Sequence, residues 1–306
     1  MNWQRISPLT TSASLLNSLL ARFMESAAKE ENEDVGYRDE DDLGVFKAKD
    51  IQLVLRQMNY RVGYILEWHP QLAIIVSEGG DKHRYLKFMG WQHDRGVMVL
   101  QYLSKIDSPS NYTISDVQFW PVAGGTVISM PAAGDWLTGL TNPSAKLWSV
   151  ALQLITAIAF MHEHNVAHMD IKPQNVVIPP TGGRLSIIDF SVSIRVRGPN
   201  VMYKGMAPEV CRGKYKPLLA DLWSCGRTLE ELCLRCSASA VRTELLELAG
   251  RLTHRNPEAR PTMSTVLRWV ASAQRREENT VFPALWSVEL CTSLLPADGL
   301  PDFYQH

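Results

Sequence analysis

The chain has 306 residues, with 31 lysines and arginines against 32 aspartates and glutamates. This balance gives no basic surface for nucleic acid or acidic lipid, so we expect neither nucleic acid nor a membrane among its partners. An odd set of 5 cysteines excludes a disulfide scaffold in a chain this long. The N-terminus has no continuous apolar segment of the signal-peptide type, and we expect a cytoplasmic or nuclear protein.

The first part of the chain is predicted to be an extension, residues 1–60, outside the main fold. Leucines recur at helical spacing in residues 12–24, and residues 25–42 then carry a heavy excess of acids over bases. Such charge density cannot be buried, which predicts a solvated linker. A docking role for this linker is the alternative.

Residues 61–130 are predicted to form a small antiparallel β-sheet with one helix. Three short β-rich runs, YRVGYILEW, LAIIVSE and HRYLKFM, are separated by turn signals at residues 69–70 and 79–80. GVMVLQYL, residues 96–103, has the apolar spacing of a helix face. VQFWP and TVISM, joined by a Gly-containing turn, predict a hairpin.

Residues 131–272 are predicted to form a helical part that begins after a short connecting segment, Met130 to Gly134. Asn142 and Pro143 predict a helix cap and a first-turn proline. A buried stripe follows for about five turns: Leu147, Val150, Ala151, Leu154, Ile158 and Met161. Strands first and helices after predict an α+β architecture of two lobes with a cleft between them, followed by a tail over residues 273–306.

Several short motifs occur in a fixed order in the helical part. HMDIKPQN spans residues 168–175, IIDFS spans 187–191, APE spans 207–209, DLWSCG spans 221–226, and Arg260 follows. Together they resemble the eukaryotic protein kinases. The resemblance implies a bilobal protein kinase fold, with a small antiparallel β-sheet N-lobe and a helical C-lobe, that uses ATP and Mg²⁺. The short activation segment also resembles divergent kinase-like proteins of mushroom-forming fungi.

The resemblance assigns catalytic or metal-binding roles to four polar residues of the first two motifs. Phosphoryl transfer needs an in-line geometry, cations on the transferred charge and an acceptor for the hydroxyl proton. Asp170 is expected to orient the hydroxyl and accept its proton, and Lys172 to neutralise charge on the γ-phosphoryl group. Asn175 and Asp189 are expected to hold Mg²⁺. Lysine at 172 followed by Pro173 resembles the serine/threonine class, so the expected substrate is a protein hydroxyl of serine or threonine.

The predicted N-lobe differs from the family in the residues that are expected to bind the nucleotide. The family's G-x-G-x-x-G turn is missing, and Glu67-Trp68-His69-Pro70-Gln71 is the most plausible equivalent. Lys87 is the candidate for the strand lysine that holds the phosphates, with an exposed strand lysine as the alternative. Ala133 in the connecting segment is expected to contact the nucleotide, and Tyr85 is expected to crowd it.

The helix glutamate that should pair with the strand lysine is also missing. The apolar spacing of the helix places Gly96 at its position, with Asp94 and Asp81 as possible substitutes. Ser191 replaces the glycine of the D-F-G motif, which narrows backbone freedom there.

Other motif residues are expected to be structural. The resemblance places the His168 ring in the core beneath Phe190, and pairs Glu209 with Arg260. Cys233 and Cys236 are expected to be buried helix thiols, because no second pair completes four zinc ligands.

Three functions remain open on the sequence. The first is an active serine/threonine protein kinase, because Asp170, Lys172, Asn175 and Asp189 are all present. The second is a pseudokinase that binds partners and transfers little or no phosphoryl group, because the glycine turn and the helix glutamate are missing. The third is a kinase-fold enzyme that acts on a small-molecule hydroxyl. The oligomeric state is not indicated by any of these features.

Overall fold

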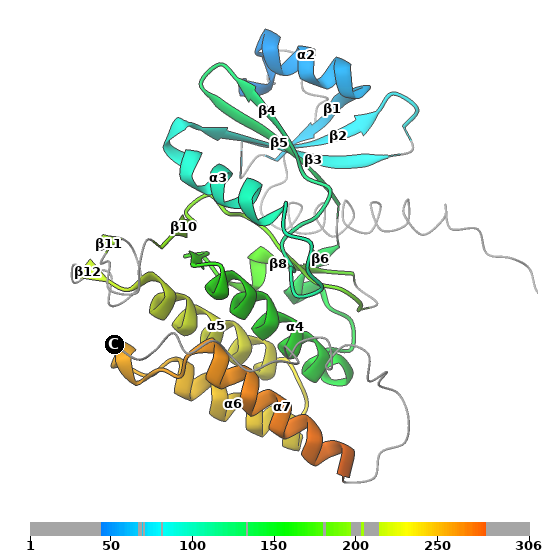
Figure 1. The fold of residues 1–306 in the computed structure, drawn as a ribbon. Coiled ribbons are helices and arrows are strands. Elements are labelled where there is room, and N and C mark those ends of the chain that lie inside the picture. Colours follow the sequence, from blue (N-terminus) through cyan, green and yellow to red (C-terminus); the bar gives the residue numbers. More distant parts are fainter. Residues whose placement is uncertain are drawn as a thin grey trace, which may run out of the picture. The chain divides into compact units, whose positions relative to one another are not determined.

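The computed structural model describes residues 44–66, 69, 71–80, 82–132, 134–179, 182–196, 203–204 and 214–279. The described residues from Val45 onward belong to one compact unit. The unit combines a β-rich lobe with a helical lobe, as predicted (Figure 1). The predicted helix and acidic linker within residues 12–42, and the tail beyond residue 279, lie outside the described residues.

The β-rich lobe is built on one antiparallel sheet of five strands in the order β1-β2-β3-β5-β4. The strands are β1 (Tyr60–Ile65), β2 (Leu72–Ser77), β3 (His83–Gly90), β4 (Gln118–Val122) and β5 (Gly125–Pro131). The helical elements of this lobe are η2 (Gly44–Lys47), α2 (Lys49–Met58), η3 (Trp91–His93) and α3 (Asp94–Leu103). The three predicted strands, the hairpin and the helix over residues 96–103 are all confirmed.

The alternation along β3 separates the two faces of the sheet. Leu86 is fully buried and packs in the cluster under α2. Met89 belongs instead to the main core, which also contains residues of α3. Because successive strand residues point to opposite faces, Lys87 shares the face of Met89. The lysine therefore points to the side of the sheet on which α3 and the helical lobe lie.

Helix α2 is part of the β-rich lobe. Its buried residues Ile51, Val54 and Leu55, together with Phe46 of η2, pack in one cluster with sheet residues such as Ile75. Asn59 ends the helix in the left-handed conformation, with φ 62°, which Asn tolerates well. The predicted boundary at residue 60 is therefore wrong for this segment: the packed unit begins at Val45.

The helical lobe contains four described long helices and several two- or three-residue strands. The helices are α4 (Pro143–Glu163), α5 (Pro217–Leu234), α6 (Ala240–Leu252) and α7 (Met263–Asn279). The short elements before α5 are β6 (Asp135–Trp136), η4 (Leu137–Gly139), β7 (Val166–Ala167), η5 (Pro173–Asn175), β8 (Val176–Ile178), β9 (Ser186–Ile187), β10 (Ile194–Arg195), β11 (Tyr203–Lys204) and β12 (Lys214–Tyr215). The 3-10 turn η7 (Pro257–Ala259) precedes α7.

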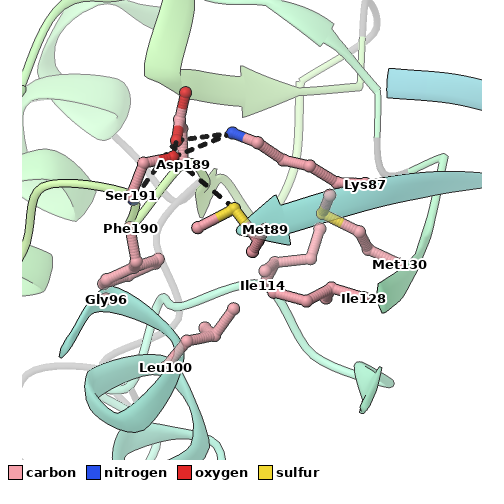
Figure 2. Close-up of a pocket in the computed structure, with 10 residues that line it drawn as sticks. All are labelled: Lys87, Met89, Gly96, Leu100, Ile114, Ile128, Met130, Asp189, Phe190 and Ser191. Atoms are coloured by element: carbon pink, nitrogen blue, oxygen red, sulfur yellow. Dashed lines mark hydrogen bonds and ion pairs between the residues drawn. The ribbon is translucent and has the colours of Figure 1, made fainter. Parts of the chain in front are cut away.

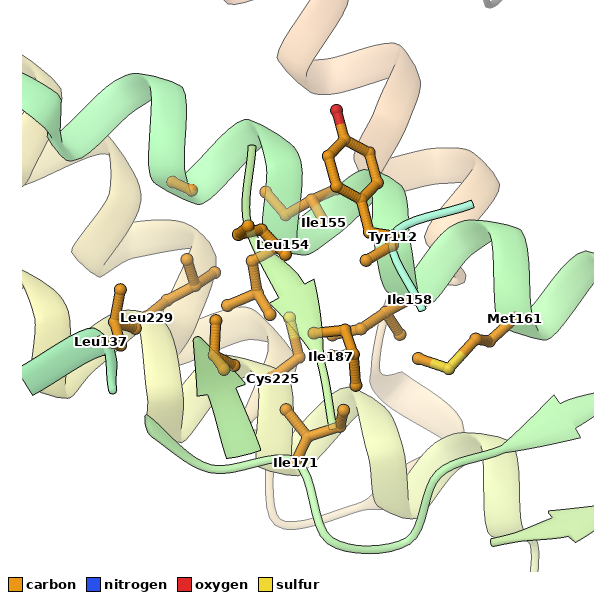
Figure 3. Packing of buried hydrophobic residues seen from close by; sticks show 14 of the residues in the cluster. Tyr112, Leu137, Leu154, Ile155, Ile158, Met161, Ile171, Ile187, Cys225 and Leu229 are labelled. Atoms are coloured by element: carbon orange, nitrogen blue, oxygen red, sulfur yellow. The ribbon is translucent and has the colours of Figure 1, made fainter. Parts of the chain in front are cut away.

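Helix α4 lies at the centre of this lobe. Every residue of its predicted apolar stripe is buried, and Leu154, Ile158 and Met161 pack against side chains from β9 and α5 (Figure 3). By length and composition α4 could cross a membrane, but 61% of its most apolar window is buried in the protein. That burial is typical of a core helix. One detail of the predicted start is wrong: Asn142 has φ 48° and makes no side-chain capping bond, so Pro143 alone marks the first turn.

Candidate functional site

The loop between β7 and β8 brings three of the predicted site residues together. The Asp170 carboxylate lies 2.7 Å from the Lys172 ammonium. The Asn175 amide nitrogen donates to both the backbone oxygen and the side-chain oxygen Oδ2 of Asp170, each at 2.8 Å. Asp170 and Lys172 keep 37% and 46% of their side chains exposed, so both are accessible from solvent. Asn175 is buried, and its side chain is fixed by both bonds to Asp170.

A buried aspartate on α5 holds the start of this loop. Asp221 is fully buried, and its carboxylate accepts the backbone N–H groups of His168 at 2.7 Å and Met169 at 2.8 Å. Met169 has φ 71°, a conformation that a non-glycine residue adopts at a cost of about 1–3 kcal/mol. Its N–H bond to Asp221 helps to offset this cost. The sequence identifies Asp221 only as part of the DLWSCG motif. Its hydrogen bonds to the loop are seen only in the folded structure.

His168 joins the loop to the segment that carries Asp189. Its ring meets the ring of Phe190 edge to face, with the centroids 4.8 Å apart, and Nε2 lies 3.0 Å from the oxygen of Ile188. The N–H of Ile188 in turn donates to the oxygen of Asn175 at 3.0 Å. Burial lowers the pKa of His168 and keeps the ring neutral. The predicted core position of His168 is confirmed.

Lys87 and Asp189 form an ion pair across the two lobes. The ammonium lies 2.7 Å from Oδ1 of the carboxylate, and the side chains are 9% and 29% exposed. Asp189 has φ 62°, so the backbone turns at this residue. Burial by itself would raise the pKa of Asp189, but the charge of Lys87 and hydrogen bonds from Lys87 and Ser191 outweigh it, and the pKa is lowered. Asp189 is therefore an anion over the physiological pH range.

Ser191 completes this cluster (Figure 2). Its hydroxyl oxygen lies 3.0 Å from the Lys87 ammonium, 3.8 Å from the sulfur of Met89, and within hydrogen-bond distance of Oδ1 of Asp189. Its backbone oxygen lies 3.2 Å from Nδ1 of His93. From the sequence, Ser191 is predicted only as a replacement for glycine, and these side-chain contacts are not predicted.

A small apolar cavity lies beside the cluster. It is lined by Lys87, Met89, Gly96, Leu100, Ile114, Ile128, Met130, Asp189, Phe190 and Ser191 (Figure 2). Its volume of about 20 Å³ holds a water molecule and not an aromatic base. Tyr85, which is predicted to crowd the nucleotide, does not line this cavity. Burial of its side chain raises the pKa of the Tyr85 hydroxyl.

Gly96 lies on α3 in direct contact with the Asp189 segment. A Cβ atom at this position would fall 2.0 Å from the backbone oxygen of Phe190, closer than any real contact. A glutamate therefore cannot replace Gly96 without moving the helix. Of the two predicted substitutes, Asp94 begins α3 and forms no ion pair with Lys87 within the described part of the chain, and Asp81 lies outside it.

The turn between β1 and β2 occupies the position predicted for the phosphate lid. It is tight, because the N–H of His69 donates to the oxygen of Leu66 at 2.9 Å and the N–H of Leu72 donates to the oxygen of His69 at 2.8 Å. Burial lowers the pKa of His69, and the charge of Lys87 adds to the effect. The other lid residues of the prediction, at positions 67, 68 and 70, are not among those described.

Some predicted residues cannot be placed. Ala133 and the APE motif, residues 207–209, are outside the described ranges, so the expected pair of Glu209 with Arg260 stays a prediction. Arg260 is buried and donates to the backbone oxygens of His254 at 3.0 Å and Leu219 at 2.7 Å.

The cysteines of the C-x-x-C pair are buried free thiols, as expected. Cys233 lies on α5 and Cys236 follows it. Burial raises the pKa of Cys233 to about 11 and also raises that of Cys236. Within the described ranges no group of three or more His, Cys, Asp or Glu side chains could hold a metal ion. These thiols are therefore protonated packing residues.

The donor set nevertheless suits Mg²⁺ bound together with a phosphate. Mg²⁺ prefers oxygen ligands, and it commonly uses one or two protein side chains with substrate phosphates and water. Asn175 turns its amide nitrogen to Asp170, which directs its carbonyl oxygen away from that residue. Asp189 binds Lys87 and Ser191 through the single oxygen Oδ1. Asn175 and Asp189 would be the residues that hold the cation.

Comparisons with known proteins find a family-model match that includes the loop of Asp170 and the segment of Asp189 but not Lys87. Residues 136–243 match the family model of the protein kinase domain. A probable serine/threonine-protein kinase CHK1 homolog of Encephalitozoon cuniculi is 40% identical over 86 residues, which cover 25% of this chain and 20% of that protein. A probable serine/threonine-protein kinase HAL5-like of Kluyveromyces lactis is 34% identical over 140 residues, covering 39% of this chain and 18% of that protein.

Another similar protein is the protein kinase gsk3 of Schizosaccharomyces pombe. It is 37% identical over 102 residues, which cover 31% of this chain and 26% of that protein. The matches thus span about a quarter or less of the length of these relatives.

Proposed function

We propose that this chain, which belongs to the eukaryotic protein kinase superfamily, transfers the γ-phosphoryl group of ATP to a serine or threonine hydroxyl of a protein substrate. The observation that carries the proposal is the convergence of Asp170, Lys172 and Asn175 in one hydrogen-bonded loop. That loop is joined through His168 and Ile188 to the segment of Asp189.

Each residue of the loop has a contact that suits its proposed role. Asp170 is partly exposed, so its carboxylate can orient an entering hydroxyl and accept its proton. Lys172 lies beside that carboxylate and places a positive charge where the transferred group would pass. Asn175 and Asp189 would hold Mg²⁺, which supplies positive charge on the phosphate oxygens when bound. Lys87 would hold the remaining phosphates of the nucleotide.

The serine/threonine class is supported by two kinds of observation. Lys172 followed by Pro173 resembles the loop of that class. The similar proteins of Encephalitozoon cuniculi and Kluyveromyces lactis are named as probable serine/threonine-protein kinases. We further infer a cytoplasmic or nuclear location from the cysteine usage.

The test is transfer of label from γ-labelled ATP with Mg²⁺ to the protein itself and to a mixture of serine- and threonine-containing proteins. Asp170→Asn is expected to lower transfer by about 100-fold or more, because it removes the proton acceptor. Asp189→Asn is expected to abolish it by removing a metal ligand. Transfer that survives both substitutions contradicts the proposal.

The second candidate is a pseudokinase that binds protein partners. It is supported by Gly96, since the described part of α3 offers Lys87 no acidic partner. A melting shift with ATP and Mg²⁺ but no transfer would favour this function. Phosphorylation of a sugar or alcohol, and of no protein, would instead favour a small-molecule kinase.

A further inference from the structure

We infer that Ser191 is a positioning residue that fixes the Lys87 ammonium against Asp189, in the place of the missing helix glutamate. The inference rests on the proposed function, because the position of Lys87 matters for catalysis only if Lys87 contacts a nucleotide. It assigns a role to a residue that departs from the D-F-G motif.

The three side chains form a closed polar triangle. Lys87 donates to Oδ1 of Asp189 at 2.7 Å and to the hydroxyl oxygen of Ser191 at 3.0 Å. The hydroxyl of Ser191 donates in turn to the same Oδ1. The Lys87 ammonium and the Ser191 hydroxyl both donate to Oδ1 of Asp189. The ammonium is therefore held at that oxygen, and neither group uses Oδ2. Hydrogen bonds to charged groups are stronger than neutral ones, so this triangle restricts Lys87 more than the ion pair alone would.

Helix α3 cannot supply the usual partner in this arrangement. Its residue Gly96 packs directly on the backbone of Phe190, where a Cβ atom would fall 2.0 Å from the oxygen. A glutamate side chain at this position would push the helix away from the segment it contacts. In the described ranges, the ion pair and the hydrogen bonds of the Lys87 ammonium all go to the segment 189–191.

Residues of the β-rich lobe also contact Ser191. Its hydroxyl also lies 3.8 Å from the sulfur of Met89 on β3, and its backbone oxygen lies 3.2 Å from Nδ1 of His93 on η3. The residue is therefore bound through both its side chain and its backbone. A hydroxyl that is held in this way can orient Lys87, whereas a glycine at this position offers no such group.

The test compares three substitutions of Ser191 in the full chain. Ser191→Ala and Ser191→Gly both remove the hydroxyl, but only the second restores backbone freedom. We expect both to lower kcat about tenfold, the effect of about 1.4 kcal/mol in the transition state, with the KM for ATP changed by less than about threefold. Ser191→Thr keeps the hydroxyl and is expected to stay within about threefold of the wild-type kcat.

The control is Ser272→Ala on α7, where the hydroxyl donates at 2.8 Å to the oxygen of Arg268 within its own helix. It is expected to leave kcat unchanged. A normal kcat for Ser191→Ala with a lowered kcat for Ser191→Gly would show that only the backbone matters, and would overturn the inference. A merely structural role would lower the melting temperature of the Ala and Gly variants without separating kcat from KM.

A second readout does not depend on activity. Trace acetylation with acetic anhydride, followed by mass spectrometry, measures how fast Lys87 reacts relative to the exposed Lys49. Ser191→Ala is expected to raise the relative rate of Lys87 at least about threefold, because the ammonium loses one of its two restraints. An unchanged rate overturns the inference. If the wild-type chain transfers no phosphoryl group, the proposed function fails, and the acetylation still decides whether Ser191 positions Lys87.

Discussion

Lys87 is a nearly buried cation, and Asp189 and Ser191, which its ammonium contacts, both lie more than 100 residues later in the chain. Burying an ammonium group without an opposite charge is costly, so the fold depends on Asp189 as much as the site does. We predict that Lys87→Met and Asp189→Asn each lower the free energy of unfolding by about 1–3 kcal/mol. The double variant should lose less than the sum, by about 1 kcal/mol, because the two residues contact each other.

Urea unfolding of the four proteins measures this coupling. Because the fold lowers the pKa of Asp189, its contribution is present above about pH 4 and is lost as the pH falls further. Additive losses at pH 7 would show that the pair does not stabilise the fold.

His168 makes stability depend on pH near neutrality. Burial lowers its pKa in the folded protein. The unfolded chain therefore binds more protons below about pH 6.5, and its stabilisation is lost as the pH falls through this region. For this one group the free energy of unfolding should fall by up to about 1.4 kcal/mol per pH unit.

Unfolding curves between pH 7 and 5 test this prediction. His168→Phe keeps a ring against Phe190 but cannot titrate, so its curve should be shallower than that of the wild type. Parallel curves would mean that His168 is not the titrating group.

At this scale, the sequence is informative where residues are close in the chain. Asp170, Lys172 and Asn175 share one loop, and their spacing alone predicts that they lie together. The contacts of Ser191 could not be predicted in this way. These contacts form because strand β3 lies next to a segment about 100 residues later in the chain. That proximity is set by the packing of the two lobes and not by the local sequence.

At the scale of secondary-structure elements, helix α3 packs directly against the segment that carries Asp189. Gly96→Ala would place a Cβ atom 2.0 Å from the oxygen of Phe190, so the helix or the segment must move. We predict a loss of about 1–3 kcal/mol in the free energy of unfolding.

The chain supplies a matched control in Gly250 on α6. No atom lies within 4 Å of a Cβ added there, and alanine is the better helix former. Gly250→Ala should therefore be neutral, or stabilising by up to about 1 kcal/mol. Thermal or urea unfolding separates the two; equal effects would contradict the close contact at Gly96.

Helix α2 shows how an element can be missed although its pattern is present. Ile51, Val54 and Leu55 have helical spacing and are buried. Because they follow an acidic segment, the predicted extension includes them. Composition is averaged over many residues, whereas burial depends on the partner surface, here the sheet residues around Ile75.

The packing of α2 gives a further prediction. Phe46 is fully buried beside this helix, so Phe46→Ala should lower the free energy of unfolding by about 3–5 kcal/mol. Leu53→Ala on the same helix is the control, because Leu53 is 55% exposed, and a change within about 0.5 kcal/mol is expected. Urea unfolding measures both; a small effect at Phe46 would mean that this segment is not part of the folded unit.

At the scale of the whole molecule, the two lobes contribute different parts of one proposed site. The helical lobe supplies the loop of Asp170 and the Asp189 segment, and the β-rich lobe supplies Lys87. The lobes could be predicted from the order of strands and helices, and the helical lobe from its motifs. The place of the turn around His69 could also be predicted, but its hydrogen bonds could not, because the turn lacks the glycine pattern of a phosphate-binding loop.

The most direct test of this account is a crystal structure of the chain with a non-hydrolysable ATP analogue and Mn²⁺, whose anomalous scattering locates the cation. We predict Mn²⁺ at about 2.1 Å from oxygens of Asn175 and Asp189, with the Lys87 ammonium on the nucleotide phosphates. A nucleotide bound with its phosphates away from Lys87, or an anomalous peak that touches neither Asn175 nor Asp189, would contradict the account.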